Sequence, residues 1–299
     1  MSVPIAYLAV VVVWSTTPLA IKWSSDSSVT PFAAVSARMF IAAVIACVVV
    51  ALFRANAGLK RENIKHYCVA SLGIFPTMPL VYWGAQFIPS GLISVIYALS
   101  PFLITLITVV FFGAKQWSIM RYLALSIALG GLLLVSIDQW LQSGVEGGYP
   151  FVDIAWAILA VFGATVLFSL SSVLVKYQPR NIDPLEQTLG TLTFSIPGLV
   201  LSWLLLDGSF PQVISTEAMM STLYLAIVGS LIAYFSFFYV LSALPVSVSG
   251  LIPLITPGIA VWLGAVVAGE PVTLMMVLGS VLILLGLLLH ELPKWRGDC

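Results

Sequence analysis

The sequence consists largely of apolar stretches of roughly 20 residues, separated by short polar links. A helix needs about 20 residues to cross the ~30 Å hydrocarbon core of a bilayer. We therefore expect ten membrane-spanning helices and no separate soluble domain. In the first half these helices are expected at residues 3–22, 31–53, 66–87, 91–112 and 121–138. In the second half they are expected at residues 153–175, 184–206, 220–243, 247–268 and 272–290.

Composition points to the same class of fold. Hydrophobic residues make up 61% of the chain and charged residues only 8%, whereas soluble domains carry about 25% charged residues. The 12 basic and 12 acidic side chains cancel, so no basic surface favours nucleic acid as a partner. The cysteines, Cys47, Cys68 and Cys299, are too scattered for a disulfide framework or a CxxC metal site. The sequence thus predicts an all-α membrane protein with the lipid bilayer as its surroundings and with neither metal nor cofactor.

The distribution of lysine and arginine predicts the orientation, because short cytoplasmic loops carry an excess of both. If the N-terminus lies in the cytoplasm, the outer side of the expected spans holds only Lys22. The inner loops and tail then hold Arg54, Lys60, Arg61, Lys65, Lys115, Arg121, Lys176, Arg180, Lys294 and Arg296. We therefore expect both termini in the cytoplasm. The expected location is the cytoplasmic (inner) membrane of a bacterium.

The two halves of the sequence repeat one another. The stretch WSTTPLAIK at residues 14–22 returns as FSLSSVLVK at residues 168–176. The positions that match at separations of 153 to 156 residues are Pro31 with Pro184, Pro89 with Pro245, Pro101 with Pro257, Gly113 with Gly269, and Gly131 with Gly286. With five spans in each half, the second half must enter the membrane upside down. We expect two inverted five-helix repeats, residues 1–146 and 147–299, an architecture typical of secondary transporters.

These residues also carry a resemblance to a known family. The pattern runs through Trp14, Ser15, Lys22, Pro31, Arg38, Pro101, Gly269, Glu270, Gly279 and Gly286, and it resembles the EamA-type transporters of the drug/metabolite transporter superfamily. The second half departs from it with Thr191 near the place that matches Arg38, and the first half has Ala114 where the second has Glu270. The resemblance covers the whole chain. It implies a ten-helix transporter of small metabolites, commonly amino acids or related polar compounds, without fixing the substrate.

Arg38 is the most informative single residue, because a charge within a membrane span normally faces the bundle interior or a wet cavity. One interpretation is a counter-charge for an anionic group such as an amino-acid carboxylate, which a guanidinium binds through two hydrogen bonds. The other is a structural arginine that binds carbonyls or extends to the outer interface. The sequence leaves both open.

Three further charged residues have a structural and a functional interpretation. Glu270 suits the first turn of the last span, where a carboxylate complements the helix dipole. It is also the candidate for a protonatable coupling group, with protons as the coupling ion. Lys22 and Lys176 end matching helices on opposite sides of the membrane, where lysine commonly acts as an anchor. The alternative is a gating role, in which each lysine would meet carbonyls or acids in only one access state.

Small polar and aromatic residues recur at helical spacing on several expected spans. In the fourth span Tyr97 and Pro101 share a face with Ser94, and in the third span Tyr82 shares a face with Gln86. The expected substrate cavity is lined by Trp14, Thr17, Arg38, Tyr82, Gln86, Tyr97, Pro101, Ser171, Thr191, Tyr234 and Pro257. Its mixture of rings and hydroxyl groups suits a small amphipathic solute.

These features predict a secondary transporter that moves an amino acid or similar solute by alternating access, in the direction of export. A passive uniporter or channel and a membrane scaffold are the alternatives. We expect no enzyme and no catalytic residue, because His66 and His290 lack a paired acid and cysteine and no HExxH or GxSxG string occurs. The chain is expected to act as a monomer or a homodimer, with glycine-bearing fifth and tenth spans packing at the periphery.

Overall fold

The computed structural model describes residues 2–25, 28–54, 58–113, 119–143, 149–178, 182–211, 213–249, 252–269 and 272–295. Within these ranges the regular structure is helical. The first half contains α1 (Val3–Ser24), α2 (Pro31–Phe53), the short 3₁₀ helix η2 (Arg61–Asn63), α3 (Ile64–Ser71), α4 (Thr77–Gly84), α5 (Ser90–Tyr97), α6 (Ser100–Phe112) and α7 (Ile119–Ser143). The second half contains α8 (Phe151–Lys176), α9 (Pro184–Leu206), α10 (Thr216–Tyr224), the π-helical η3 (Leu225–Ile232), α11 (Ala233–Ala243), α12 (Val246–Ser249), α13 (Ile252–Ala268) and α14 (Leu274–Trp295).

Most of these helices are apolar enough to cross a membrane. In the described part of the chain, six are also long enough: Val3–Ser24, Pro31–Phe53, Ser90–Phe112, Phe151–Lys176, Pro184–Leu206 and Thr216–Ala243. Three shorter apolar helices cover Leu123–Val135, Thr256–Ala268 and Leu274–Gly286. Each of these nine falls on a different expected span. The chain therefore has the helices of a multi-pass membrane protein, while the total of ten crossings stays a prediction.

The third expected span, residues 66–87, differs from the prediction of one helix. It is divided into α3 and α4 by a turn at residues 72–76. Pro76 explains the interruption, because proline has no N–H to donate and its ring collides with the preceding helical turn. At the matching place in the second half, the span that runs through α10 and α11 contains η3. Both halves therefore depart from regular α-helix at the same point of their third span.

Residues paired by the repeat produce the same local structure in both halves. Pro31 and Pro184 are the first residues of α2 and α9, where the missing N–H of proline would have no helical partner in any case. Gly113 and Gly269 follow α6 and α13, and both adopt a φ of 64°. That left-handed conformation is one that glycine adopts without strain. The repeated sequence thus sets helix ends as well as helix positions.

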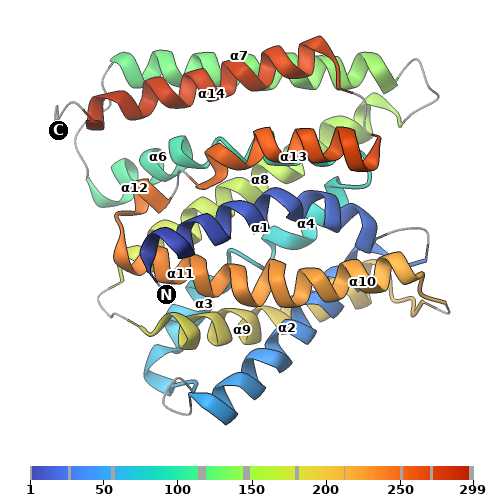
Figure 1. Cartoon of the computed structure of the whole chain (residues 1–299), viewed down its shortest axis with the longest axis vertical. Coiled ribbons are helices and arrows are strands. Elements are labelled where there is room, and N and C mark those ends of the chain that lie inside the picture. The colour runs from blue at the N-terminus through green and yellow to red at the C-terminus, as the bar shows by residue number, and fades with distance from the viewer. Residues whose placement is uncertain are drawn as a thin grey trace.

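The helices form an interlocked bundle (Figure 1). α7 and α14 lie side by side along one edge of the molecule, and α2 packs with α9 at the opposite edge. Between these edges, α1 packs against α13, α10 and α11. Its counterpart α8 packs against the counterparts of those helices, namely α5, α6, α3 and α4. Each half thus buries its first helix in the other half. The start of α1 and the end of α14 lie at the same end of the bundle (Figure 1).

Glycines hold α7 and α14 in close contact. A Cβ atom on Gly131 would lie 2.5 Å from the carbonyl oxygen of Gly279, and one on Gly279 would lie 2.7 Å from the carbonyl oxygen of Gly131. A Cβ on Gly286 would lie 2.6 Å from the carbonyl oxygen of Ala124. Small residues permit such close backbone approach between membrane helices. The expected packing of the fifth and tenth spans at the periphery is confirmed, and they pack against each other.

Candidate functional site

A cavity of about 70 Å³ lies inside the bundle. A single water needs about 10–15 Å³ of such space, so the cavity has room for roughly five waters or a small organic molecule. Helices from both halves contribute to its wall. The lining residues are Trp14, Thr17, Pro18, Ile21, Arg38, Met78, Val81, Ile93, Ser94, Tyr97, Phe168, Gly229, Tyr234, Pro253 and Thr256.

Arg38 supplies the charge in the wall, and it is only 1% exposed. Its Nε donates to Ser230 Oγ at 2.8 Å, and Nη2 donates to the Gly229 carbonyl oxygen at 3.0 Å. Nη1 donates to the Tyr82 hydroxyl at 3.3 Å. A guanidinium has five N–H groups, so contacts with the described residues leave two of them for a ligand. None of the described carboxylates forms an ion pair with Arg38.

The π-helical η3 provides two of the three groups that hold Arg38. In a π-helix the backbone hydrogen bonds run from residue i to i+5, and such segments are rare and frequently lie at functional sites. Here the irregular segment presents Gly229 and Ser230 to the guanidinium. Ser230 Oγ in turn donates to Met39 Sδ at 3.6 Å. The position of the buried charge therefore depends on a local departure from α-helical geometry.

Aromatic rings form another part of the wall. The ring of Trp14 lies 5.5 Å from that of Phe168 and 6.4 Å from that of Tyr234, with nearly perpendicular planes in both pairs. The ring of Tyr97 lies 6.0 Å from that of Phe168. Trp14 and Phe168 are the matching rings of the repeated stretch. These rings, contributed by both halves, offer apolar faces that also attract cations.

Hydroxyl groups on α5 complete the polar part of the cavity. Ser94 Oγ and the Tyr97 hydroxyl are buried, and neither has a hydrogen-bond partner among the described residues. Leaving a buried polar group unsatisfied costs about 1–3 kcal/mol. Groups of this kind in a cavity wall are available to a bound solute. The cavity can therefore bind a small molecule that combines an anionic group, hydrogen-bonding groups and an apolar part.

Five of the residues expected to bind the substrate line this cavity together: Trp14, Thr17, Arg38, Tyr97 and Tyr234. Tyr82 is not part of the wall, but it is fully buried and its hydroxyl accepts a hydrogen bond from Arg38.

The other expected site residues lie outside the cavity wall. Gln86 is exposed, and Ser171 Oγ donates to the carbonyl oxygens of Val69 and Ala70 at 3.1 Å each. Thr191 Oγ1 donates to the carbonyl oxygen of Gln187 at 2.7 Å. Pro101 and Pro257 are buried in α6 and α13.

Two other expectations concern charges near helix ends. Lys176 Nζ donates to the carbonyl oxygens of Leu241 at 2.7 Å and Ser242 at 3.3 Å, in the last turn of α11. This contact fits an anchor, and a gating role would require the same kind of contact, so it does not decide between the two. The coupling candidate, Glu270, lies outside the described residues.

Several lining residues are absent from the expected list of cavity residues. Ser94 is already expected on the same face of the fourth span as Tyr97, and Phe168 could have been included because it matches Trp14 in the repeat. Gly229 gave no sequence signal, since its role depends on a π-helical turn. Among the described residues no cluster of His, Cys, Asp or Glu could hold a metal ion.

Comparison with known proteins concerns the family and the fold of the chain. The model of the EamA-like transporter family matches residues 1–137 and again residues 155–290. The "uncharacterized transporter YoaV" of Bacillus subtilis is 22% identical over 96% of both chains. A "probable terminal-alkyne amino-acid exporter" of Streptantibioticus cattleyicolor is 25% identical over 74% of both chains. A solved crystal structure with 17% sequence identity shares the fold over 100% of this chain and 99% of its own, with a TM-score of 0.67.

Proposed function

Because this chain belongs to the EamA-like transporter family, we propose that it is a secondary transporter for a small amphipathic metabolite with a carboxylate, most simply an amino acid. The observation that carries this proposal is the buried guanidinium of Arg38, which lines the cavity and pairs with none of the described carboxylates. A buried charge without a counter-charge is unfavourable, so an anionic group of the substrate would stabilise the site. The two remaining N–H groups of Arg38 could bind both oxygens of a carboxylate.

The rest of the cavity supports an amino acid over a simple inorganic anion. The faces of Trp14, Phe168 and Tyr234 suit an apolar side chain or an ammonium group. Ser94 and Tyr97 offer hydroxyl oxygens that could accept hydrogen bonds from an ammonium group. The relative from Streptantibioticus cattleyicolor named as an amino-acid exporter also supports this substrate class, and it favours export as the direction.

Alternating access is the proposed mechanism. The family model matches the chain twice, which supports two repeats at residues 1–146 and 147–299, and the inverted topology predicted by the loop charges would relate them across the membrane. Each half buries its first helix in the other half, so rocking of the halves would change access to a cavity shared by both. A proton or solute gradient would supply the energy, and the protein would reside in the cytoplasmic membrane of a bacterium.

Ligand binding by Arg38 variants tests the proposal. Purified protein is screened by thermal shift against the common amino acids, because a ligand selective for the folded state raises apparent stability. Charge-assisted hydrogen bonds contribute about 1.5–3 kcal/mol, so Arg38→Gln is expected to weaken the affinity of a stabilising amino acid about 10- to 100-fold. Arg38→Lys, which keeps charge but loses the planar pair of donors, is expected to fall between wild type and Arg38→Gln.

Arg61→Gln is the matched control, since Arg61 is exposed and lies outside the cavity. Unchanged affinity of every stabilising amino acid in both Arg38 variants would exclude the carboxylate role. Flux into proteoliposomes with and without a pH gradient then separates coupled transport from the alternative of a passive uniporter or channel. A protein that binds and moves none of these solutes would favour the scaffold alternative.

A further inference from the structure

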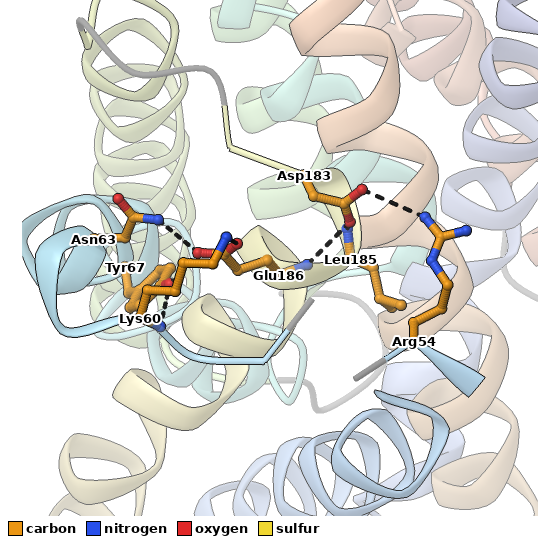
Figure 2. A network of polar contacts seen from close by, with 7 residues as sticks. All are labelled: Arg54, Lys60, Asn63, Tyr67, Asp183, Leu185 and Glu186. Carbon is orange, nitrogen blue, oxygen red and sulfur yellow. Dashed lines mark hydrogen bonds and ion pairs between the residues drawn. The ribbon is translucent and has the colours of Figure 1, made fainter. Parts of the chain in front are cut away.

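A polar network joins the two halves of the chain at the end of the bundle where α2 ends and α9 begins (Figure 2). Its centre is Glu186, in the first turn of α9, whose side chain is 2% exposed. Glu186 Oε1 accepts hydrogen bonds from Asn63 Nδ2 at 2.6 Å and from the Tyr67 hydroxyl at 2.5 Å. Its Oε2 lies 3.1 Å from Lys60 Nζ. All three donors belong to the first half, whereas Glu186 belongs to the second.

The network lies in the contact between α3 and α9, which we call the seam, and its side chains are tightly packed there. The Tyr67 hydroxyl also accepts a hydrogen bond from the backbone N–H of Lys60 at 3.1 Å, which fixes the approach to α3. The Tyr67 ring packs so tightly on Gly190 that a Cβ there would collide with the ring. The same ring lies 5.7 Å from that of Phe194. Polar contacts and ring packing therefore hold α3 on α9 together.

A second, more exposed ion pair lies beside this network. Arg54 Nη2 lies 3.5 Å from Asp183 Oδ2, with the two side chains 62% and 40% exposed. Asp183 also caps α9 by accepting a hydrogen bond from the backbone N–H of Leu185 at 2.9 Å (Figure 2). Exposed pairs of this kind contribute little, so the polar part of the contact between α3 and α9 rests on the buried Glu186 carboxylate.

Because Glu186 is buried, its contacts with Lys60, Asn63 and Tyr67 are expected to form together or to be lost together. Removing the partners of a buried charge while it stays buried is strongly unfavourable. Glu186 can therefore lose Lys60, Asn63 and Tyr67 only if water reaches it, which requires α3 and α9 to move apart. A closed seam and an open, hydrated seam are thus two distinct states.

The network and the cavity occupy different levels of the bundle. Arg38, in the cavity wall, belongs to α2, and Arg54 follows the last residue of that helix. Their separation of 16 residues corresponds to about 24 Å along a helix. The lining residues of α1, from Trp14 to Ile21, likewise lie in the half of that helix that is remote from its start. The network therefore closes the end of the bundle that lies farther from Arg38. By the loop charges this is the cytoplasmic end.

The opposite end has no matching acid at the equivalent position of the first half. Pro184 matches Pro31 in the repeat, and the residue two positions later is Glu186 in α9 but Ala33 in α2. Only the second half has this carboxylate, so the same set of polar contacts cannot close both ends of the bundle.

We propose that Glu186, with Lys60, Asn63 and Tyr67, forms the gate at the cytoplasmic end of the transport pathway and keeps that end closed in the empty protein. The gate goes beyond the substrate site. It depends on alternating access between the halves, but not on what Arg38 binds.

Thiol accessibility in the absence of substrate tests the gate. Ser171 is buried on α8 against the backbone of α3, so Ser171→Cys places a reporter beside the seam. The background carries serine in place of Cys47, Cys68 and Cys299. A membrane-impermeant maleimide is added to inside-out vesicles, which expose the cytoplasmic face. Modification is expected to be slow with the network intact and at least about tenfold faster in Glu186→Ala, which releases all three donors.

Glu217→Gln is the matched control, because Glu217 is also in the first turn of a helix but is exposed on α10. It is expected to leave the modification rate unchanged. Lys60→Gln provides a second test that leaves no hole in the core, since the Lys60 side chain is 50% exposed; a rise of about threefold or more is expected. If the reporter thiol reacts no faster in Lys60→Gln, and in folded Glu186→Ala, than in the parent, the gate is excluded. Because no substrate is present, that outcome would leave the proposed role of Arg38 untouched.

Discussion

The contacts of Arg38 explain how a positive charge can remain buried in a membrane protein and still be available to a ligand. Two of the groups that fix it, Gly229 and Ser230, belong to one π-helical segment, and the third is the Tyr82 hydroxyl. All are neutral. They orient the guanidinium without cancelling its charge, which is the condition under which an anionic solute gains most from binding.

The hydroxyl of Ser94 provides a test of the cavity by a change at a single residue. Removing an unsatisfied buried hydroxyl should not destabilise the empty protein, and Ser94→Ala is expected to raise its free energy of unfolding by up to about 1 kcal/mol. The same change should weaken the binding of the amino acid found in the screen about 5- to 10-fold, because one hydrogen bond is lost. Thermal unfolding with and without ligand measures both effects.

Ser236→Ala is the control for this experiment. Ser236 Oγ is also buried without a partner among the described residues, but Ser236 is not part of the cavity wall. It should give a similar change in stability with unchanged affinity. Equal loss of affinity in both variants would contradict a direct contact between Ser94 and the ligand.

The sequence predicted those residues of the cavity wall that stand out within a single helix. Trp14, Thr17, Arg38, Tyr97 and Tyr234 stand out because each is polar or aromatic within an apolar span. The contributions of Ile93 and Gly229 depend on how helices pack and on backbone geometry. Neither can be read from residue type or spacing.

Helix ends were predicted well where one local residue determines them. The expected bounds of α2 and α9, residues 31–53 and 184–206, agree with the structure because Pro31 and Pro184 begin both helices. The interruption at residues 72–76 and the π-helical η3 were not predicted. An apolar run has the same hydropathy whether its backbone is regular or not, so a count of 20 apolar residues could not reveal the irregular turns.

Adjacent glycines on α7 test packing at the scale of the element. A Cβ on Gly131 would meet the backbone of α14, whereas a Cβ on Gly130 meets nothing within 4 Å. Overpacking costs about 1–3 kcal/mol, so Gly131→Ala is expected to lower the free energy of unfolding by that amount. Gly130→Ala should be neutral or slightly stabilising, since alanine favours helix over glycine. Unfolding of both proteins in the same detergent provides the measurement, and equal stability of the two would contradict the close contact of α7 with α14.

At the scale of the whole molecule, the two halves are related in sequence and differ in their polar contacts. The exchange of α1 and α8 between the halves creates one cavity with walls from both. The buried arginine and the buried Glu186 each occur in one half only. The two proposed roles, binding by Arg38 and gating by Glu186, therefore fall in different halves of the chain.

The inverted topology proposed for the two halves makes a prediction about sidedness. Leu59 and Val213 occupy matching links of the two halves and are both exposed. Leu59→Cys, in the background without native cysteines, is expected to react with an impermeant maleimide from the cytoplasmic side. Val213→Cys is expected to react from the opposite side. Labelling of both from one side would show that the halves are parallel.

The π-helical η3 links the length of one helix to the chemistry of the cavity. A π-helical turn accommodates one residue more than an α-helical turn, so η3 has the form of a one-residue insertion. Deleting a residue there would allow α10 and α11 to join as one regular helix, with the side chains of α10 rotated by about 100° relative to those of α11. Tyr224, which hydrogen-bonds Thr16 at 2.5 Å, and the Gly229 carbonyl that holds Arg38 would both lose their places. A one-residue gap at this point in the alignment of a relative would therefore mark a protein that anchors its arginine differently, even where the arginine itself is kept.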